Sequence, residues 1–222
     1  MKTRVICISR TLGAGGEEVA RAVSQRMGFR YVDDEIIAKA AEKEGVDVEV
    51  VKDAERRKSF IDRLLESLAV APAPEVMAIS PGLMHPAAFA TGLELSGSGA
   101  ALRGTEHYRQ LIRDVVHDTA GQGNVVIVAH AAAMALAGEE GVLRVLVTAT
   151  PEVRAKRLST AQHVGLSEAA TMIEDSDKGR RDYFKQFYSI REELPVHYDF
   201  VCNSDQLSWE QIVEAVVTAA RR

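Results

Sequence analysis

A glycine-rich turn near the start of the chain carries the clearest chemical signal in the sequence. It follows the uninterrupted apolar run from Val5 to Ile8, which is typical of a strand buried on both faces of a parallel sheet. Its residues are Gly13, Ala14, Gly15 and Gly16. Glycine tolerates positive φ angles and lets backbone N–H groups approach a ligand closely. A helix predicted from Gly16 to Met27 adds unpaired donors and a partial positive charge, so the pattern predicts a phosphate-binding loop, hereafter the glycine loop (residues 10–16).

The residues that usually complete such a loop are replaced. In the pattern G-x-x-x-x-G-K-[ST], a lysine reaches the outer phosphates and a hydroxyl holds magnesium. Aligned on the glycines, this chain has Gly16 at the lysine position, followed by Glu17 and Glu18. Two carboxylates there would repel a polyphosphate. Acidic residues in a first helical turn also stabilise the helix dipole, so both interpretations stay open.

Acidic residues also follow the second predicted strand, at Asp33 and Asp34. If that strand neighbours the first, these carboxylates lie beside the glycine loop, at the edge of the sheet where α/β proteins bind ligands. Either aspartate could equally cap the helix that follows.

Two basic clusters occur later in the chain. Arg154 and Arg157 lie one helical turn apart, just after the fourth predicted strand. The run from Asp177 to Tyr183 contains three more cations, Lys178, Arg180 and Arg181. On a movable segment, such cations could close over phosphates and offset the charge of a phosphoryl-transfer transition state. A solvated helix face is an equally good interpretation of each cluster.

Strands and helices alternate along the chain. Apolar runs predict five strands, at residues 5–8, 29–33, 124–129, 143–148 and 199–202. Predicted helices between them imply a parallel sheet covered on both faces. Four of the 6 prolines fall within residues 70–104 together with several glycines, which predicts a flexible insertion. We expect one α/β domain over residues 1–222.

Composition limits the partners. The net charge of −5 comes from 27 basic and 32 acidic residues without a basic block, so a nucleic-acid or anionic membrane surface is not favoured. Cys7 and Cys202 lie in predicted strands, and we expect both to be reduced, buried and without a metal. No leader and no long apolar run are evident, which predicts a cytoplasmic protein. Nothing in the sequence excludes a homodimer.

Together and in this order, the motifs resemble those of the cytidylate kinase-like family, a branch of the phosphate-loop nucleoside monophosphate kinases. The resemblance covers nearly the whole chain apart from residues 70–104. Its carriers are Ile8-Ser9-Arg10, Gly13-Ala14-Gly15-Gly16 with Glu18, Tyr31-Val32-Asp33, residues 124–129, Arg154 with Arg157, and Asp177-Lys178-Gly179-Arg180 up to Tyr183.

The resemblance implies a three-layer P-loop NTPase fold, an α/β fold with a five-stranded parallel sheet flanked by helices and with a lid region at residues 154–190. It implies transfer of the γ-phosphoryl of ATP, with Mg²⁺, to a pyrimidine nucleoside monophosphate or another small acceptor. The implied ATP site comprises Ser9, Arg10, Gly13, Ala14, Gly15, Gly16, Glu17 and Glu18, with Glu18 as a candidate magnesium ligand. The implied catalytic cations are Arg10, Arg157, Arg180 and Arg181. The implied acceptor site comprises Asp33, Asp34, His130, Asp177 and Lys178.

The chain departs from the family pattern by losing positive charge. Members already tend to lack the loop lysine, and Arg10 is a candidate replacement because a guanidinium can grip two oxygens. They usually have a basic or polar residue in place of Glu17, and Gly-Arg in place of Ala129-His130. A catalytically silent nucleotide-binding or regulatory module therefore stays open. The few charges within residues 70–104 also leave open an acceptor that is not a nucleotide.

Overall fold

The computed structural model describes residues 2–33, 36, 39, 42, 43, 110–128 and 131–221. Three predictions lie outside the described residues: the flexible insertion at 70–104, and the site residues Asp34 and His130. The expectation of one domain over the whole length stays a prediction. None of the helices in the described part combines the length and the apolar character that a bilayer crossing requires.

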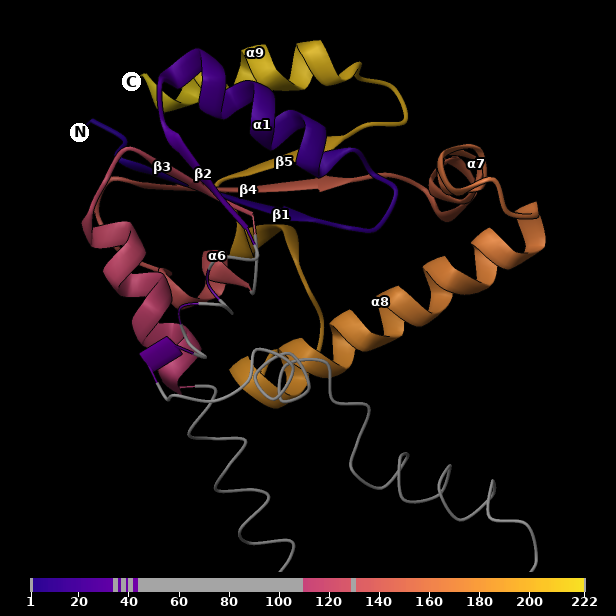
Figure 1. The fold of residues 1–222 in the computed structure, drawn as a ribbon, viewed down its shortest axis with the longest axis horizontal. Coiled ribbons are helices and arrows are strands. Elements are labelled where there is room, and N and C mark those ends of the chain that lie inside the picture. Colours follow the sequence, from indigo (N-terminus) through magenta and orange to yellow (C-terminus); the bar gives the residue numbers. More distant parts are fainter. Residues whose placement is uncertain are drawn as a thin grey trace, which may run out of the picture.

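Five parallel strands form one sheet, in the order β2-β3-β1-β4-β5 (Figure 1). This confirms the predicted five-stranded parallel sheet. The strands are β1 (Val5–Arg10), β2 (Arg30–Val32), β3 (Val125–Ile127), β4 (Val142–Thr148) and β5 (Phe200–Asn203). Strand β3 covers residues 125–127 of the strand predicted at 124–129. Residues 129 and 130 lie outside the described residues.

Strand β1 lies at the centre of the sheet, between β3 and β4, and is buried on both faces. Successive side chains of a strand point to opposite faces. Val5 and Cys7 accordingly pack on one face and Ile6 and Ile8 on the other, each of them at most 4% exposed. The continuous apolar run thus predicted the burial of β1 correctly. Because β1 is held between two strands, Arg10 at its carboxyl end has a fixed position at the edge of the sheet.

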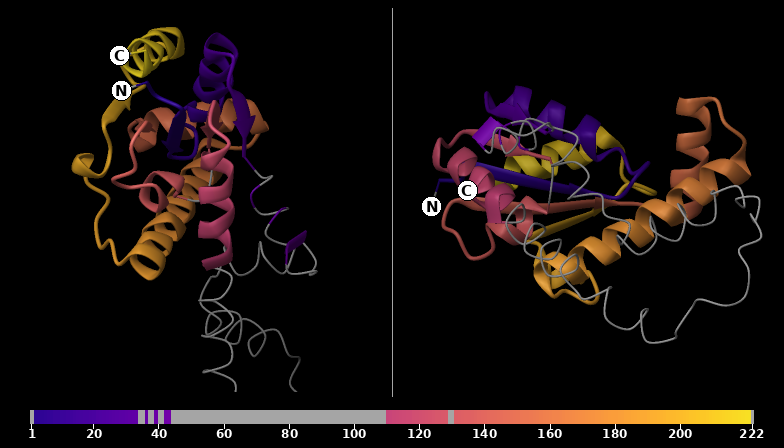
Figure 2. Two further views of the ribbon diagram at one scale, coloured as in Figure 1. Left: turned by 90° about the vertical axis from the view of Figure 1, so that its left-hand side faces the viewer. Right: turned by 60° about the horizontal axis from the view of Figure 1, so that its bottom comes forward.

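Helices cover both faces of the sheet, which gives the three layers. Helices α1 and α9 lie on one face, and α8 and the helix at residues 110–121 lie on the other (Figures 1 and 2). The bounds are α1 Gly16–Met27, α6 Ala132–Ala135, α7 Pro151–Gln162, α8 Leu166–Tyr188 and α9 Trp209–Ala220, with a 3-10 turn at Pro195–His197. Apolar spacing predicted the bounds of α1 correctly, and a capping box of Ser208 with Gln211 begins α9. The short α6 was not predicted.

The condition under which Asp33 would lie directly beside the glycine loop, adjacency of β1 and β2, is not met. Strand β3 lies between β1 and β2, so the strand that leads to Asp33 is not adjacent to the strand that leads to the glycine loop. Sequence order says nothing about which strand is inserted between two others. Asp33 still follows a strand end at the same edge of the sheet, because all five strands are parallel.

The two cysteines are buried and free, as expected. Burial raises the pKa of the Cys7 thiol to about 12 and that of Cys202 to about 11. Both thiols therefore stay protonated at neutral pH and act as small apolar side chains in the sheet.

Candidate functional site

The glycine loop connects the end of β1 to the first turn of α1. Gly13 and Gly15 have φ angles of 79° and 82°, a region that only glycine enters without strain. Gly15 is the N-cap residue of α1, and it has no side chain with which to cap the helix. The first amides of a helix have no intrahelical acceptor, so these donors point out of the helix end and can meet an anion.

Neighbouring elements pack tightly on two of the glycines. A Cβ atom on Gly13 would lie 2.8 Å from the carbonyl oxygen of Arg154. A Cβ atom on Gly15 would collide with the indole ring of Trp209, the first residue of α9. Any side chain at Gly15 would therefore displace Trp209 and strain the backbone at the same time.

Arg10, the candidate replacement for the missing lysine, is engaged by a carboxylate. Its guanidinium forms an ion pair with Glu17, in the first turn of α1. The pair is partly solvated, because the side chains of Arg10 and Glu17 are 31% and 44% exposed. The Nε atom of Arg10 is buried without a hydrogen-bond partner among the described residues. Glu18, one position further, is exposed.

Arg154 joins α7 and α8 to the glycine loop. Its guanidinium is almost fully buried and makes two hydrogen bonds to the Asp177 carboxylate, at 2.9 and 2.6 Å. It also donates to the carbonyl oxygen of Ala149 at 3.0 Å and to that of Leu12 at 3.4 Å. The bonds join α7, α8 and the glycine loop, so the Asp177 carboxylate, expected in the acceptor site, is occupied by Arg154.

Arg157 reaches the loop through uncharged partners. It donates to the hydroxyl and the carbonyl oxygen of Ser204, at 2.8 and 2.7 Å. The Ser204 hydroxyl in turn donates to the carbonyl oxygen of Ala14, inside the glycine loop, at 2.8 Å. The guanidinium is thus held beside the loop, and the partners found for it in the described part of the chain are neutral oxygen atoms.

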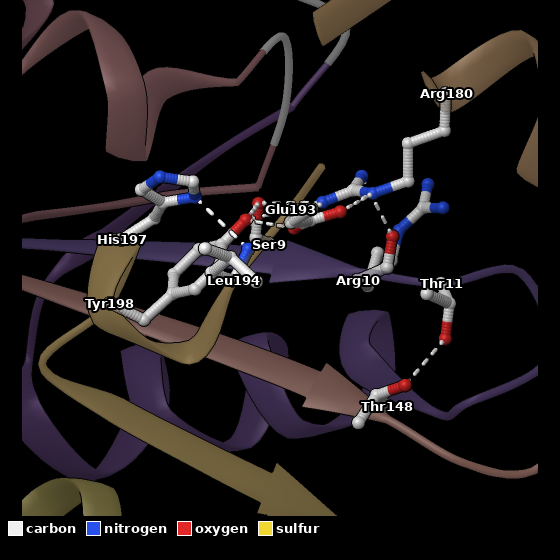
Figure 3. Close-up of polar contacts among 9 residues, drawn as sticks. All are labelled: Ser9, Arg10, Thr11, Thr148, Arg180, Glu193, Leu194, His197 and Tyr198. Carbon is white, nitrogen blue, oxygen red and sulfur yellow. Dashed lines mark hydrogen bonds and ion pairs between the residues drawn. The ribbon is translucent and has the colours of Figure 1, made fainter. Parts of the chain in front are cut away.

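Arg180 is held by a buried network at the end of β1 (Figure 3). Two parallel bonds of 2.7 Å join it to Glu193, and a third bond of 3.1 Å reaches the carbonyl oxygen of Arg10. It also donates to the Ser9 hydroxyl at 3.2 Å, and the Tyr198 hydroxyl contacts both Ser9 and Glu193. Ser9 and Arg180, both expected at the phosphates, are therefore joined to each other by this network.

The network shifts the pKa values of Glu193 and Tyr198. Burial alone would raise the pKa of Glu193, but hydrogen bonds and charge from Arg180 outweigh it and lower that pKa. Burial and the Glu193 charge raise the pKa of Tyr198, so its hydroxyl stays protonated. Glu193 is therefore an anion and Arg180 a cation throughout the physiological range.

Two pockets flank Arg10. The larger, of about 770 Å³, runs along the glycine loop and is bordered by Glu17, Glu18, Arg157 and Trp209. The smaller, of about 190 Å³, lies under the end of β1 and is lined by Ser9, Asp33, Arg180 and apolar residues of β1, β3 and α6. Arg10 lines both.

The small pocket has one acidic wall at Asp33. The Tyr31 hydroxyl donates to this carboxylate at 3.1 Å. Burial, followed by the charge of Asp33, raises the pKa of Tyr31 to about 12, so the phenol keeps the proton that it donates. The bond fixes the direction of the Asp33 carboxylate at the edge of the sheet.

Lys178 and Arg181 are exposed on α8 and line neither pocket. The structure therefore brings together the glycine loop, Ser9, Arg10, Arg157 and Arg180, with Asp33 nearby, and leaves these two cations outside. Glu18 is a possible magnesium ligand at the mouth of the larger pocket. Within the described ranges, no group of three or more His, Cys, Asp or Glu residues could hold a metal. A single carboxylate fits Mg²⁺ that is bound mainly by phosphates and water.

The match to a family model decides what kind of chain this is. A model described as the cytidylate kinase-like family matches residues 5–206. The chain belongs to the cytidylate kinase-like family. The match runs from the first residue of β1 to the turn after β5, so it includes the glycine loop, α7 and α8, and it ends before Trp209, which lines the larger pocket.

Solved structures with a similar fold have low sequence identity to this family member. An uncharacterized protein from Eubacterium ventriosum ATCC 27560 has a TM-score of 0.64 at 14% identity, with 98% of each chain covered. TT1252 from Thermus thermophilus has a TM-score of 0.50 at 14% identity, covering 99% of this chain and 98% of that one. A shikimate kinase from Bacteroides thetaiotaomicron has a TM-score of 0.45 at 15% identity, covering 97% and 95%. No curated protein matches the sequence. The family match and the sheet confirm the predicted P-loop kinase fold.

Four residues at the site were missed in the sequence: Glu193, Tyr198, Ser204 and Trp209. Ser204 directly follows β5, and Trp209 begins the next helix, α9. The carboxyl ends of parallel strands are where ligands bind, so this position was the available signal. Glu193 and Tyr198 stand in an irregular segment between α8 and β5, and no local pattern pairs them with Arg180.

The Arg180–Glu193 pair makes a test of this network. Glu193→Gln keeps the shape of the side chain and leaves a buried guanidinium without its counterion, so we expect the free energy of unfolding at pH 7 to fall by about 3 kcal/mol. Urea denaturation measures it. Glu192→Gln, at the exposed neighbouring position, is the matched control and should change little.

The pH dependence follows from the sign of the shift. The folded-state pKa of Glu193 lies below its usual value of 4.5, so its stabilisation is complete above that pH and is lost as the pH falls through the folded-state pKa. The difference between wild type and Glu193→Gln should be constant from pH 6 to 8 and shrink below about pH 4.5. An undiminished difference at low pH, or equal stability of the two glutamine variants, would contradict the network.

Proposed function

We propose that the protein is an ATP-dependent phosphotransferase that moves the γ-phosphoryl of ATP to a nucleoside monophosphate, of the pyrimidine class by family resemblance, or to another small acceptor. One observation carries the proposal: Arg10 lines both the larger pocket along the glycine loop and the smaller pocket under β1. In-line transfer needs a donor and an acceptor on either side of a charge-neutralising group. Arg10, between the two pockets, would be that charge-neutralising group.

The larger pocket suits the nucleotide donor. Amides at the start of α1 would hold the β-phosphate, and Arg157 would neutralise charge on the γ-phosphate from its position beside Ala14. Its volume lies within the range of small-molecule sites, and Trp209 gives it an aromatic wall on which a base could stack. Glu18, which lines this pocket, would help to hold Mg²⁺, and the ion would supply positive charge for the transferred phosphoryl group.

The smaller pocket suits the reacting end of the acceptor. At about 190 Å³ it is too small for a whole nucleotide, so the described residues would surround only the attacking group and its immediate neighbours. Asp33 would orient the attacking oxygen, and Arg10 would lie between it and the donor. Lys178 and Arg181 would reach the phosphates only after a movement of α8, so their predicted roles depend on such a movement.

A second candidate function is a nucleotide-binding module without catalysis. The observation that favours it is the pairing of two proposed catalytic cations with carboxylates, Arg10 with Glu17 and Arg180 with Glu193. A guanidinium neutralised in this way stabilises developing negative charge less than a free one does.

Turnover separates the two candidates. Purified protein is incubated with ATP, Mg²⁺ and a panel of nucleoside monophosphates and small alcohols, and ADP formation is measured. We expect acceptor-dependent turnover in wild type and none in Gly15→Val, whose side chain would collide with Trp209. Binding of ATP without turnover for any acceptor would favour the silent module, and absence of both would contradict both candidates.

Trp209 gives a direct readout of donor binding. It is the only tryptophan in the chain and lines the larger pocket, so we expect ATP to change its fluorescence in a saturable way. Inorganic phosphate at the same concentration serves as the control without a base. An unchanged spectrum at millimolar ATP, while calorimetry detects binding, would place the nucleotide elsewhere.

Arg157 should contribute more to ATP affinity than another residue of the same charge on the same pocket. We expect Arg157→Ala to weaken ATP binding by roughly tenfold or more, because a hydrogen bond between charged groups is lost. Lys156→Ala removes the same charge from an exposed residue on the same pocket and should have a smaller effect. Equal losses of ATP affinity in the two variants would mean that Arg157 acts only by long-range electrostatic attraction, without a direct contact to the phosphates.

A further inference from the structure

Of the arginine–carboxylate pairs at the glycine loop, those of Arg10 and Arg180 differ in how readily they can open. The Arg180–Glu193 pair is bound by two parallel bonds, with side chains 23% and 17% exposed, and further bonds tie Arg180 to the Ser9 hydroxyl and the Arg10 carbonyl oxygen. The Arg10–Glu17 pair has side chains 31% and 44% exposed. Solvated ion pairs contribute little to stability, so Arg10 is the exchangeable cation of the two.

Glu17 holds the place that a phosphate would take. It lies in the first turn of α1, whose amides and dipole attract anions, and its carboxylate contacts the guanidinium that lines both pockets. A carboxylate and a phosphate are both bidentate acceptors for a guanidinium, so the two compete for the same donors. Once displaced, Glu17 would still repel the phosphate chain at short range.

We propose that Glu17 sets the phosphate affinity of the glycine loop by competing with the bound phosphate chain for Arg10. The inference rests on the proposed function, since it requires the loop to bind phosphates. It assigns Glu17 an effect that acts through its ion pair with Arg10, an effect that the neighbouring Glu18, the candidate magnesium ligand, should not share when Mg²⁺ is left out of the assay. The loop thereby discriminates against weakly charged anions, because a phosphate chain with several charges can displace the carboxylate more easily than a single anion can.

The test measures binding without turnover. Calorimetry of full-length protein with inorganic tripolyphosphate and with ATP gives Kd for wild type, Glu17→Gln and Glu18→Gln. The two variants remove the same charge from adjacent positions of one helical turn. We expect Glu17→Gln to lower Kd by about tenfold and Glu18→Gln to lower it by much less.

A double-mutant cycle with Arg10→Gln shows whether the effect passes through Arg10. In the Arg10→Gln background, the advantage of Glu17→Gln over Glu18→Gln should disappear. The proposal would be overturned by equal effects of the two glutamate variants when Arg10 is present, by an advantage of Glu17→Gln over Glu18→Gln that persists without Arg10, or by weaker binding in Glu17→Gln. The last result would mean that Glu17 positions Arg10 for phosphate.

The controls distinguish this failure from failure of the proposed function. If tripolyphosphate and ATP bind wild type but Glu17→Gln behaves like Glu18→Gln, the competition is refuted and the nucleotide site stands. If neither ligand binds any variant, the proposed function falls, and the inference falls with it. Thermal denaturation of each variant confirms that the compared proteins are folded.

Discussion

Crowded positive charge at the end of β1 is the constraint on which the site depends. Arg10, Arg154 and Arg180 all contact the short stretch from Ser9 to Gly16 or its first helical turn, and each is balanced by a carboxylate, Glu17, Asp177 or Glu193. Without those carboxylates, three guanidiniums near one anion-binding loop would repel one another. The pairs therefore hold the loop, α7 and α8 together before any ligand arrives.

The surroundings of these cations differ. Arg154 is buried and Arg180 is partly buried, and each is bonded to several groups at once, so they join α7 and α8 to the loop. Among the described residues, Arg157 meets neutral oxygens of Ser204, and Arg10 is held by a partly solvated partner. If the loop binds phosphates as proposed, Arg157 and, by exchange, Arg10 would supply positive charge to the ligand, while Arg154 and Arg180 would stay with their carboxylates.

Local signals predicted most of the fold. The apolar run at Val5 to Ile8, the glycines and the capping box of Ser208 with Gln211 are contained within a few residues, so periodicity and turn chemistry suffice for them. Strand order and charge partners are not local. Strand β3 separates β2 from β1, Glu193 pairs with Arg180 across a turn, and Trp209 packs on Gly15 from the other end of the chain. Those relations arise only from packing, which no single segment encodes.

We expect phosphates to bind at the glycine loop by taking Arg10 from Glu17 while Arg180 stays with Glu193. The decisive measurement is a crystal structure with Mg²⁺ and a non-hydrolysable ATP analogue. It should show the phosphate chain at the amides that begin α1, with Arg157 and Arg10 on its oxygens, Glu17 turned away, and the Arg180–Glu193 pair unchanged. A nucleotide bound outside the loop, or bound within it while the Arg10–Glu17 pair remains intact, would refute this exchange.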